Sequence, residues 1–374
     1  MYAHHFSLDP GILYLNHAAV APWPVETVDA VTRFARENGD VGARRYPDWL
    51  VVESELRKRL AELINAPSTA DIALLKSTSE GLSVIAHGLP WQAGDNIVSI
   101  AQEFPSNRVV WQSLEPRGVE VRLLDLDNAV EPEASLMRLC DPNTRLLAVS
   151  SVQYASGYRL QLEKLGAFCR ERQILFVIDA IQSLGAMPFD VTVNLADAVV
   201  ADGHKWLLGP EGTALFYCHE TLRERLHLHQ YGWHMLENAM DFEQTHWHPA
   251  TDARRFECGS PNMLGIHALH ASLGLLLEVG MDTTSDLIGR NCDTIIEETD
   301  QRGFQLLTPR ERSRRAGIVT FRIPSADNAQ IQRQLMERGV ICAYRGGGIR
   351  FSPHFYTTEQ QIRRAFASLD QIVG

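Results

Sequence analysis

From about residue 70 onward, short runs of apolar and β-branched residues alternate with amphipathic segments. This alternation is typical of strands joined by crossover helices in a mostly parallel sheet, so it predicts an α/β fold. The predicted strands are Ile72–Lys76, Asn96–Ile100, Val119–Leu124, Arg145–Ser150, Ile174–Asp179, Ala198–Ala201 and Thr213–Tyr217. The predicted helices are Glu80–His87, Ser106–Arg117, Leu162–Arg172 and Ile266–Glu278.

The pattern changes twice further along the chain. Residues 219–262 are rich in His, Trp and Pro and lack a regular period, which predicts a long loop region of the kind that often carries function. The remainder predicts an α+β arrangement: helix Asp286–Gln301, strand Gly317–Arg322, helix Ala329–Glu337, strands Val340–Ala343 and Ile349–Ser352, and a helix from Thr358. We therefore expect a large domain at 26–262, a smaller C-terminal domain at 263–374, and an N-terminal segment, 1–25, that packs with the small domain.

Charge and composition narrow the possible partners. The formal net charge of −11 argues against a nucleic-acid or anionic-membrane surface, because such binding needs clustered Lys and Arg. The six cysteines are widely spaced with no CxxC pair, which suits a reducing compartment, and no signal-peptide pattern begins the chain. We expect a cytoplasmic protein. The apolar stretch at 264–281 contains His267, His270 and Glu278, so it predicts a buried helix rather than a membrane span.

Two charged residues, Asp179 and Lys205, lie at or just after the ends of predicted strands. Lys205 lies in ADGHKWLLGPEG, between an apolar strand and a Gly-Pro turn, a setting unlike that of a solvated lysine, although a lone His-Lys pair is usually without chemistry. Asp179 ends the strand in FVIDAIQS, which puts its carboxylate at the edge of a parallel sheet where ligands bind. An acid there can pair with a protonated pyridine nitrogen, or simply cap the next segment. Gln182 can reach the same region.

A third feature precedes the helix predicted at Glu80. Ser77, Thr78, Ser79 and Glu80 fit the S-x-x-E capping box. Hydroxyls and free backbone N–H groups at a helix start form a natural seat for a phosphate. The same residues are equally consistent with a well-capped helix.

Taken in order, these motifs resemble the class V aminotransferase family of fold-type I pyridoxal 5′-phosphate (PLP) enzymes. The motifs that carry the resemblance are the TSE turn, a later aromatic residue, the ID-x-x-Q and HK strand ends, RFE-x-GSPN and a C-terminal R-x-S. The resemblance extends from Tyr14–Ala19 to Ile349–Gln360, which is nearly the whole chain. The chain looks most like the cysteine desulfurase and selenocysteine lyase branch. The resemblance implies PLP as cofactor and a fold-type I PLP-dependent transferase: a large domain with a mostly parallel seven-stranded sheet and a smaller α+β C-terminal domain.

The resemblance also implies roles for residues around the cofactor. Lys205 would carry PLP as a Schiff base and act as general base, and Asp179 would pair with the pyridine nitrogen. Gln182 would contact the phenolate side. The expected phosphate-binding residues are Thr78, Ser79 and His204. Ser260, in ECGSPN, would reach the phosphate of the other subunit, which implies a homodimer.

A second group of residues is expected to hold the substrate, a free amino acid or a small amine. Arg350 matches the arginine that binds a substrate α-carboxylate, for which the forked guanidinium is well suited. Asn16 and Ala19 fall where the family's N-terminal segment lines the pocket. Arg345, together with Arg44 and Arg45, is a candidate selector of the substrate side chain.

The chain departs from the desulfurases at two catalytic positions. They place a histidine over the ring, whereas EFPSN (Glu103–Asn107) puts Phe104 there, which can stack but cannot transfer a proton. They also need a loop cysteine to accept sulfur, and Tyr344–Gly348 has none. Cys342 lies in an apolar run and is expected to be a packing residue. A persulfide-forming desulfurase is therefore disfavoured.

Two cofactor-binding positions also differ from the family. Asp202 stands where a small hydroxyl residue usually helps to hold the phosphate, and its carboxylate would repel a dianion unless it turns away or meets a cation. The family's asparagine near the phenolic oxygen is replaced within SVQY, so Gln153 or Tyr154 is the candidate.

The histidine-rich stretch raises the possibility of a metal. His227, His229, His234, His246 and His248 would form a zinc site if the pairs converged. No Cys or paired carboxylate keeps ligand spacing with them, so we expect loop or pocket-lining histidines and no metal.

The function that we expect first is an aminotransferase acting on an α-amino acid or a small amine metabolite, since Lys205 alone can move the Cα proton. The alternative is a C–S or C–Se β-lyase, a desulfurase-like enzyme or an epimerase. A PLP-binding regulator without turnover is a third possibility, against which the presence of Lys205, Asp179 and Arg350 argues.

Overall fold

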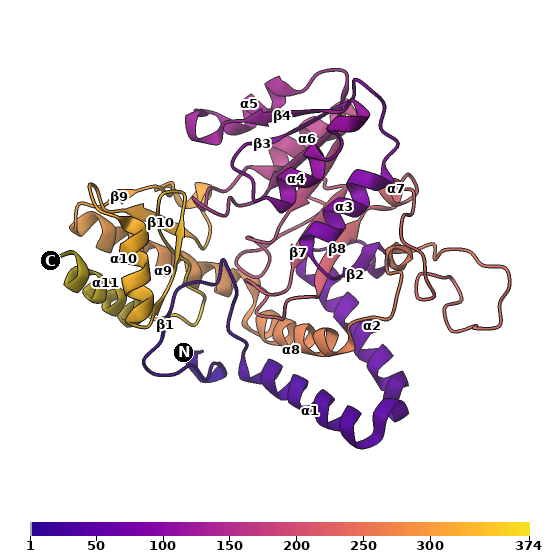
Figure 1. Ribbon diagram of the computed structural model, residues 1–374, viewed down its shortest axis with the longest axis horizontal. Coiled ribbons are helices and arrows are strands. Elements are labelled where there is room, and N and C mark those ends of the chain that lie inside the picture. The colour runs from indigo at the N-terminus through magenta and orange to yellow at the C-terminus, as the bar shows by residue number, and fades with distance from the viewer. Residues whose placement is uncertain (1) are drawn as a thin grey trace.

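The computed structural model describes residues 2–374, so the first residue of the predicted N-terminal segment lies outside the described residues. Its largest sheet has seven strands in the order β2-β8-β7-β6-β5-β3-β4 (Figure 1). The strands are β2 (Ile72–Leu75), β3 (Asn96–Ile100), β4 (Glu120–Leu124), β5 (Thr144–Ser150), β6 (Leu175–Asp179), β7 (Ala198–Asp202) and β8 (Ala214–Cys218). β8 runs antiparallel to both of its neighbours and the other pairings are parallel. The predicted α/β class is confirmed.

Helices cover both faces of this sheet, which explains why its central strands are apolar throughout. Every residue of β3, β6, β7 and β8 is buried, as expected for a sheet without a solvent face. On one face the core includes Leu82 of α3 (Thr78–Gly88) and Trp111 of α4 (Ser106–Gln112). The other face packs against α2 (Tyr46–Leu63), α6 (Leu162–Arg172) and α8 (Met263–Val279).

The C-terminal part forms a second, four-stranded antiparallel sheet in the order β12-β13-β10-β9. Its elements are α9 (Met281–Gln301), β9 (Gln305–Leu306), β10 (Val319–Arg322), α10 (Asn328–Glu337), β11 (Val340–Ile341), β12 (Ala343–Arg345), β13 (Gly348–Phe351) and α11 (Glu359–Val373). The prediction of one strand over Val340–Ala343 is wrong. β11 pairs with β1 (Leu13–Tyr14), and the chain then leaves that pair to enter the other sheet at Ala343.

Two helix predictions also differ from the structure. The helix predicted over Ser106–Arg117 ends at Gln112 and is followed by a 3₁₀ turn, Glu115–Arg117. Pro116 explains the break, because it lacks an N–H and disfavours helical geometry in the preceding residue. The sequence pattern also gave no sign of three helices, α1 (Val25–Val41), α2 and α5 (Pro132–Leu139).

The long loop predicted over residues 219–262 is largely irregular in the structure. It contains only α7 (Glu220–Arg223) and a 3₁₀ turn at Ala253–Phe256, and its middle projects from the body of the protein at the right of Figure 1. The projecting part carries exposed apolar side chains, among them Tyr231, Phe242 and Trp247.

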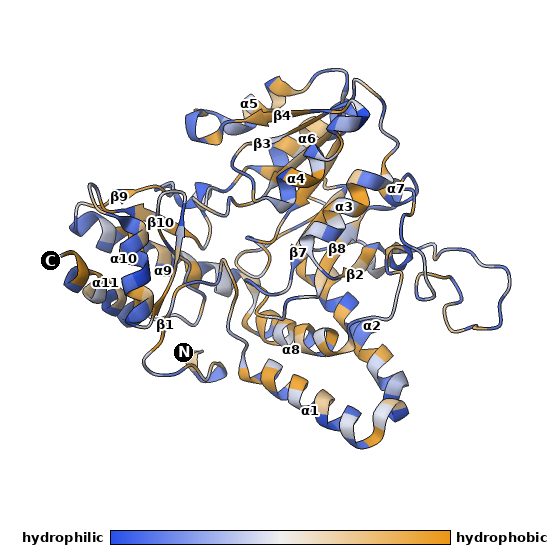
Figure 2. Cartoon of the chain, in the orientation of Figure 1, coloured by the Kyte–Doolittle hydropathy of each residue, from blue (hydrophilic) through white to orange (hydrophobic). Residues whose placement is uncertain are grey.

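The apolar stretch at 264–281 is the buried helix that was predicted. α8 is mostly apolar along its length (Figure 2) and packs against α1, α2 and α9. No single helix in residues 2–374 is long and apolar enough to cross a membrane; α8 and α9 together meet the length and composition test, but they are bent by 83°. Because α8 begins at the predicted domain boundary yet packs on α1 and α2, the division at 262/263 stays a prediction.

The N-terminal segment is attached to the C-terminal part by β1–β11 pairing and by a bridge between Asn16 and Ser352. The imidazole of His17 is fully buried in this seam. Its Nδ1 donates to the carbonyl of Ser352 (2.8 Å), and its Nε2 accepts from the hydroxyl of Tyr356 (2.6 Å). Burial lowers the pKa of His17 to about 4, so the neutral ring is the form that this seam fits.

We predict that this seam makes the fold acid-sensitive between pH 6.5 and 4. Unfolded His17 binds a proton in that range and folded His17 does not, so stability falls as the pH falls, by about 3 kcal/mol for the full shift. Urea unfolding at pH 7 and pH 5 measures this effect. His17→Gln should lower stability at pH 7 and reduce its dependence on pH, whereas the exposed His4→Gln should leave the dependence as it is.

Candidate active site

A cavity of about 230 Å³ opens at the carboxyl ends of β6 and β7. This is the edge of a parallel sheet at which ligands bind, and the loop that follows β7 carries Lys205. The structure brings together most of the residues that the sequence singled out. Those that line the cavity are Ala19, Thr78, Ser79, Phe104, Tyr154, Asp179, Gln182, Asp202, His204, Lys205, Arg345 and Arg350.

Lys205 and Asp179 are the two ionisable groups at the base of the cavity. Lys205 is 8% exposed, and burial lowers the pKa of its amine against the opposing effect of the Asp179 charge. Asp179 is 2% exposed, and burial raises the pKa of its carboxyl. Its Oδ1 accepts one bond, from the N–H of Ile181 at 3.0 Å. A buried carboxylate with so few donors is well suited to the positively charged N–H of a pyridine ring, so this end of the cavity fits PLP.

The opposite end of the cavity lies at the start of α3. The Ser77 side chain accepts from the N–H of Glu80 at 3.2 Å, as expected for the capping motif, while Glu80 accepts from the N–H of Lys76 rather than that of Ser77. Thr78 and Ser79 occupy the first turn, and the hydroxyl of Ser79 donates to Ser106 at 2.8 Å. A helix start with hydroxyls suits a phosphate.

Asp202 meets a group that can carry positive charge. Its Oδ1 lies 3.4 Å from Nδ1 of His204, and its Oδ2 accepts from the N–H of Thr78 at 3.4 Å. The backbone N–H of Asp202 in turn donates to the hydroxyl of Thr78 at 3.1 Å. The carboxylate is therefore fixed at the start of α3, with the imidazole of His204 beside it.

Gln182 is held on both sides, since its Nε2 donates to the carbonyl of Ala18 at 3.0 Å and its Oε1 accepts from Trp206 at 2.9 Å. One N–H of the amide is left for a ligand. Of the two candidates in SVQY, Tyr154 lines the cavity and Gln153 does not. The Nε2 of Gln153 instead donates to Glu103 at 2.9 Å.

Phe104 lies at the exposed side of the cavity. Its ring centre is 5.5 Å from Nζ of Lys205 and 5.3 Å from the ring of Tyr154, which it meets edge-on. The residue before it, Glu103, is buried and accepts from the N–H of Ser150 at 2.7 Å. Burial raises the pKa of Glu103. The sequence gave no sign of this acid, which anchors the Phe104 segment to the end of β5.

The guanidinium of Arg350 reaches the cavity from β13. It is 1% exposed, its Nη1 donates to the carbonyl of Tyr154 at 2.6 Å, and its Nε is buried with no hydrogen-bond partner in residues 2–374. A buried cation with free donors requires an anion, as a substrate carboxylate would supply.

Five expected residues do not line the cavity of this chain: Arg44 and Arg45, and three others. Gln153 is one of them, as described above. Asn16 lies in the seam beside Ser352, and its buried Oδ1 has no partner in the described part of the chain. Ser260 is exposed, and its hydroxyl accepts from Trp233 at 3.3 Å. Conversely, Ser106 and Ile181 line the cavity without having been predicted.

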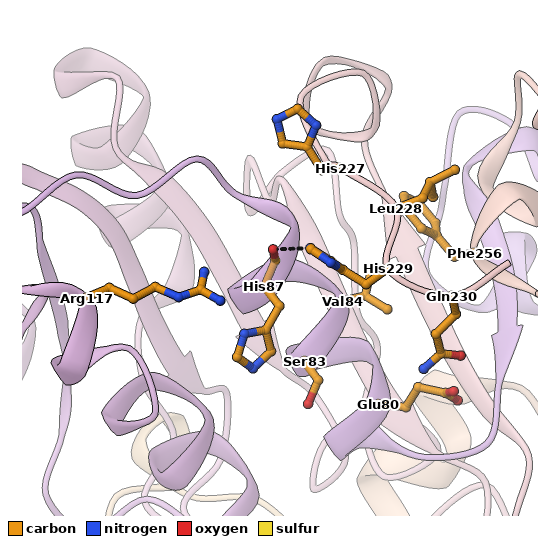
Figure 3. Close-up of a pocket in the computed structure, with 10 residues that line it drawn as sticks. All are labelled: Glu80, Ser83, Val84, His87, Arg117, His227, Leu228, His229, Gln230 and Phe256. Carbon is orange, nitrogen blue, oxygen red and sulfur yellow. Dashed lines mark hydrogen bonds between the residues drawn. The ribbon is translucent and has the colours of Figure 1, made fainter.

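The five histidines considered as zinc ligands do not form one cluster. His227 and His229 line a separate pocket on the outer face of α3, beside His87 and Arg117, where the His229 ring contacts the carbonyl of His87 (Figure 3). Across residues 2–374, the one group of three potential ligands within 4.8 Å is Glu53, His234 and Glu257.

Arg57 already supplies positive charge to that group. Its guanidinium donates to Glu53 at 2.5 Å and to Glu257 at 2.5 Å, so both carboxylates already have a cationic partner.

Comparison with known proteins agrees with this geometry. The sequence profile of the Aminotransferase class-V family matches residues 13–365. A probable cysteine desulfurase of Methanothermobacter thermautotrophicus is 29% identical over 97% of this chain and 95% of its own length. A probable cysteine desulfurase of Pyrococcus abyssi is 26% identical over 97% of this chain and 94% of its own length. The uncharacterized aminotransferase YcbU of Bacillus subtilis is 29% identical over 85% and 82%.

Solved structures establish the fold independently. The apo cysteine desulfurase of Thermococcus onnurineus NA1 superposes with a TM-score of 0.88 at 23% identity, over 97% of this chain and 94% of that one. The cystine C–S lyase C-DES, in complex with its product cysteine persulfide, gives 0.88 at 24% identity over 96% and 97%. With a profile match over nearly its whole length, the chain belongs to the class V aminotransferase family and is a fold-type I, PLP-dependent enzyme.

Proposed function

We propose that this enzyme is a C–S β-lyase that acts on a cysteine-derived α-amino acid and releases the sulfur together with its substituent. The sequence predicts an aminotransferase first, whereas the names of the relatives favour the alternative, C–S bond cleavage. The observation that carries the proposal is the lack of a thiol at the cavity: no cysteine is among its lining residues in the described chain.

The cavity residues can perform such an elimination without further groups. When bound, PLP withdraws electrons from Cα and so acidifies its proton. Lys205, whose pKa burial lowers, takes that proton, while Asp179 pairs with the ring nitrogen and Arg350 binds the α-carboxylate. Breaking the Cβ–S bond leaves the electron pair on sulfur. With one water, R–S–CH₂–CH(NH₃⁺)–COO⁻ then yields a thiol, pyruvate and ammonium, with no net oxidation.

A desulfurase reaction would need a protein thiolate to attack the substrate sulfur. At the place where desulfurases carry a cysteine loop, this chain makes a two-residue turn of Gly346 and Gly347, both with positive φ, between β12 and β13. That turn type favours glycine and leaves no room for a loop. Cys342 is 2% exposed, and burial raises the pKa of its thiol to about 12, so it is not a nucleophile.

We also propose that the enzyme is a homodimer in which Ser260 reaches the phosphate site of the other subunit. Ser260 is exposed and lies outside its own cavity, next to the projecting loop with its exposed aromatic side chains. We predict a native mass of two chains by light scattering. Ser260→Ala should weaken PLP binding about tenfold, as for the loss of one bond to a charged group, whereas the exposed Ser313→Ala should not. A monomer that binds PLP normally would contradict this.

For Asp179 we predict that substitution by Asn separates cofactor binding from chemistry. Asp179→Asn should keep PLP attached to Lys205, visible in the absorbance of the protein, and lower kcat by about 100-fold or more, since the ring nitrogen loses its charge partner. Asp197→Asn is the control: its carboxylate accepts from the N–H of Phe176 at 2.8 Å in the same sheet but outside the cavity. Equal losses in both variants would argue against the assigned role.

For the reaction itself we predict pyruvate and a thiol or persulfide in a 1:1 ratio from L-cystine or an S-alkyl-L-cysteine, without an added keto acid. Cys342→Ala and Cys258→Ala should both retain turnover within about twofold, because no protein thiol takes part. The coupled assay for pyruvate, together with a thiol reagent, measures both products. A single stoichiometric conversion of the cofactor to its amine form, with release of a keto acid, would instead establish transamination.

A further inference from the structure

Two arginines reach the cavity from the same hairpin and on the same face of its sheet. β12 and β13 are antiparallel, with Ala343 opposite Arg350 and Arg345 opposite Gly348. Because side chains alternate along a strand, Arg345 and Arg350 point to one side, as diagonal neighbours roughly 7–8 Å apart at Cα. Both line the cavity. The glycine turn between the strands sets this register, so the pairing of the two cations is built into the hairpin.

Neither arginine forms an ion pair with a carboxylate in residues 2–374. Arg345 donates to the carbonyl of Tyr344 at 2.8 Å, and Arg350 donates to that of Tyr154. The carboxylates of the cavity, Asp179 and Asp202, are the last residues of β6 and β7, and each contacts a group near its own strand end. The substrate side of the cavity therefore has two positive charges and no negative one.

The two cations also repel each other. Burial lowers the pKa of Arg350 to about 9, and the neighbouring charge of Arg345 contributes in the same direction. Arg350 is buried and is the expected partner of the α-carboxylate, whereas Arg345 is exposed at the cavity and is left without an anion. A second anionic group of the substrate can bind there, because the forked guanidinium is suited to bind a carboxylate with two hydrogen bonds.

We propose that Arg345 is a specificity-determining residue that binds a second acid group of the substrate, so that the enzyme selects cysteine derivatives whose sulfur substituent ends in a carboxylate or a similar anion. This inference rests on the proposed C–S lyase function and names its substrate class. Arg44 and Arg45, the other arginines considered as selectors, do not line the cavity, and Arg45 lies 3.5 Å from Glu37. Arg345 is thus the cavity cation without an assigned anion.

The test uses two substrates that differ only in charge: S-carboxymethyl-L-cysteine and its amide, S-carbamoylmethyl-L-cysteine. Apparent dissociation constants come from the absorbance change of the PLP-loaded enzyme and from calorimetry, and kcat/KM from pyruvate release. We expect the wild type to prefer the carboxylate by about 10-fold to 100-fold, as for charge-assisted hydrogen bonds. Arg345→Gln should reduce this preference to about threefold or less, and Arg345→Lys should keep part of it, since the charge stays but the fork is lost.

Two further variants separate specificity from damage to the fold. Arg350→Gln should weaken both substrates alike, because both have the same α-carboxylate. Arg322→Gln alters an exposed arginine of the same sheet, on β10, that donates to Gln305, and should leave the preference unchanged. The ratio of the two substrates is the decisive readout, since a general loss of folding or of PLP would lower both values together.

The proposal is overturned if the wild type does not prefer the carboxylate, or if Arg345→Gln keeps the full preference; Arg345 would then be a solvated surface residue. The failure of the lyase function gives a different result. In that case neither substrate releases pyruvate, but the binding constants still report whether Arg345 distinguishes acid from amide.

Discussion

The structure of the site depends on two groups of opposite charge that are buried in one cavity at the carboxyl ends of central strands of the large sheet. β6 and β7 are parallel neighbours, so their carboxyl ends meet, and the loop after β7 returns Lys205 toward Asp179. Burial favours the uncharged form of each group. The charge on Asp179 favours the charged form of Lys205, and the charge on Lys205 favours the charged form of Asp179. Neither group would be tolerated alone at this depth. The pocket therefore suits the roles proposed above, with Asp179 as the partner of a cationic ring nitrogen and Lys205 as the base.

A second constraint is a set of hydrogen bonds that joins the large sheet, the small sheet and the N-terminal segment around this pocket. Arg350 comes from the small sheet, yet its Nη1 donates to Tyr154 in the loop that follows β5 of the large sheet. The N-terminal segment spans the same seam: Ala18 accepts from Gln182, and Gln182 accepts from Trp206, next to Lys205. A short series of buried hydrogen bonds thus fixes Arg350, the proposed partner of the substrate carboxylate, relative to Lys205, the proposed base.

The sequence predicted those features that are set locally. Apolar runs that end in a polar residue located the strands of the large sheet and the ends at which Asp179 and Lys205 lie, and ordered motifs identified the family. The hydrogen bonds between Asp202 and Thr78 and between Gln153 and Glu103 join residues whose proximity depends on the folded sheet. The common face of Arg345 and Arg350 follows from strand register, which a two-glycine turn fixes but which periodicity alone does not reveal.

Phe104 stands where desulfurases have a histidine, and this difference limits the reactions that the site can perform. A phenyl ring cannot protonate a leaving sulfur, so the site suits a substituent that leaves as a stable thiolate or persulfide anion. The sequence predicts that Phe104 stacks on the cofactor ring, so with PLP bound the cofactor rather than Lys205 lies against the face of the phenyl group. In the proposed reaction Lys205 therefore moves the Cα proton without a second acid on that face of the cofactor.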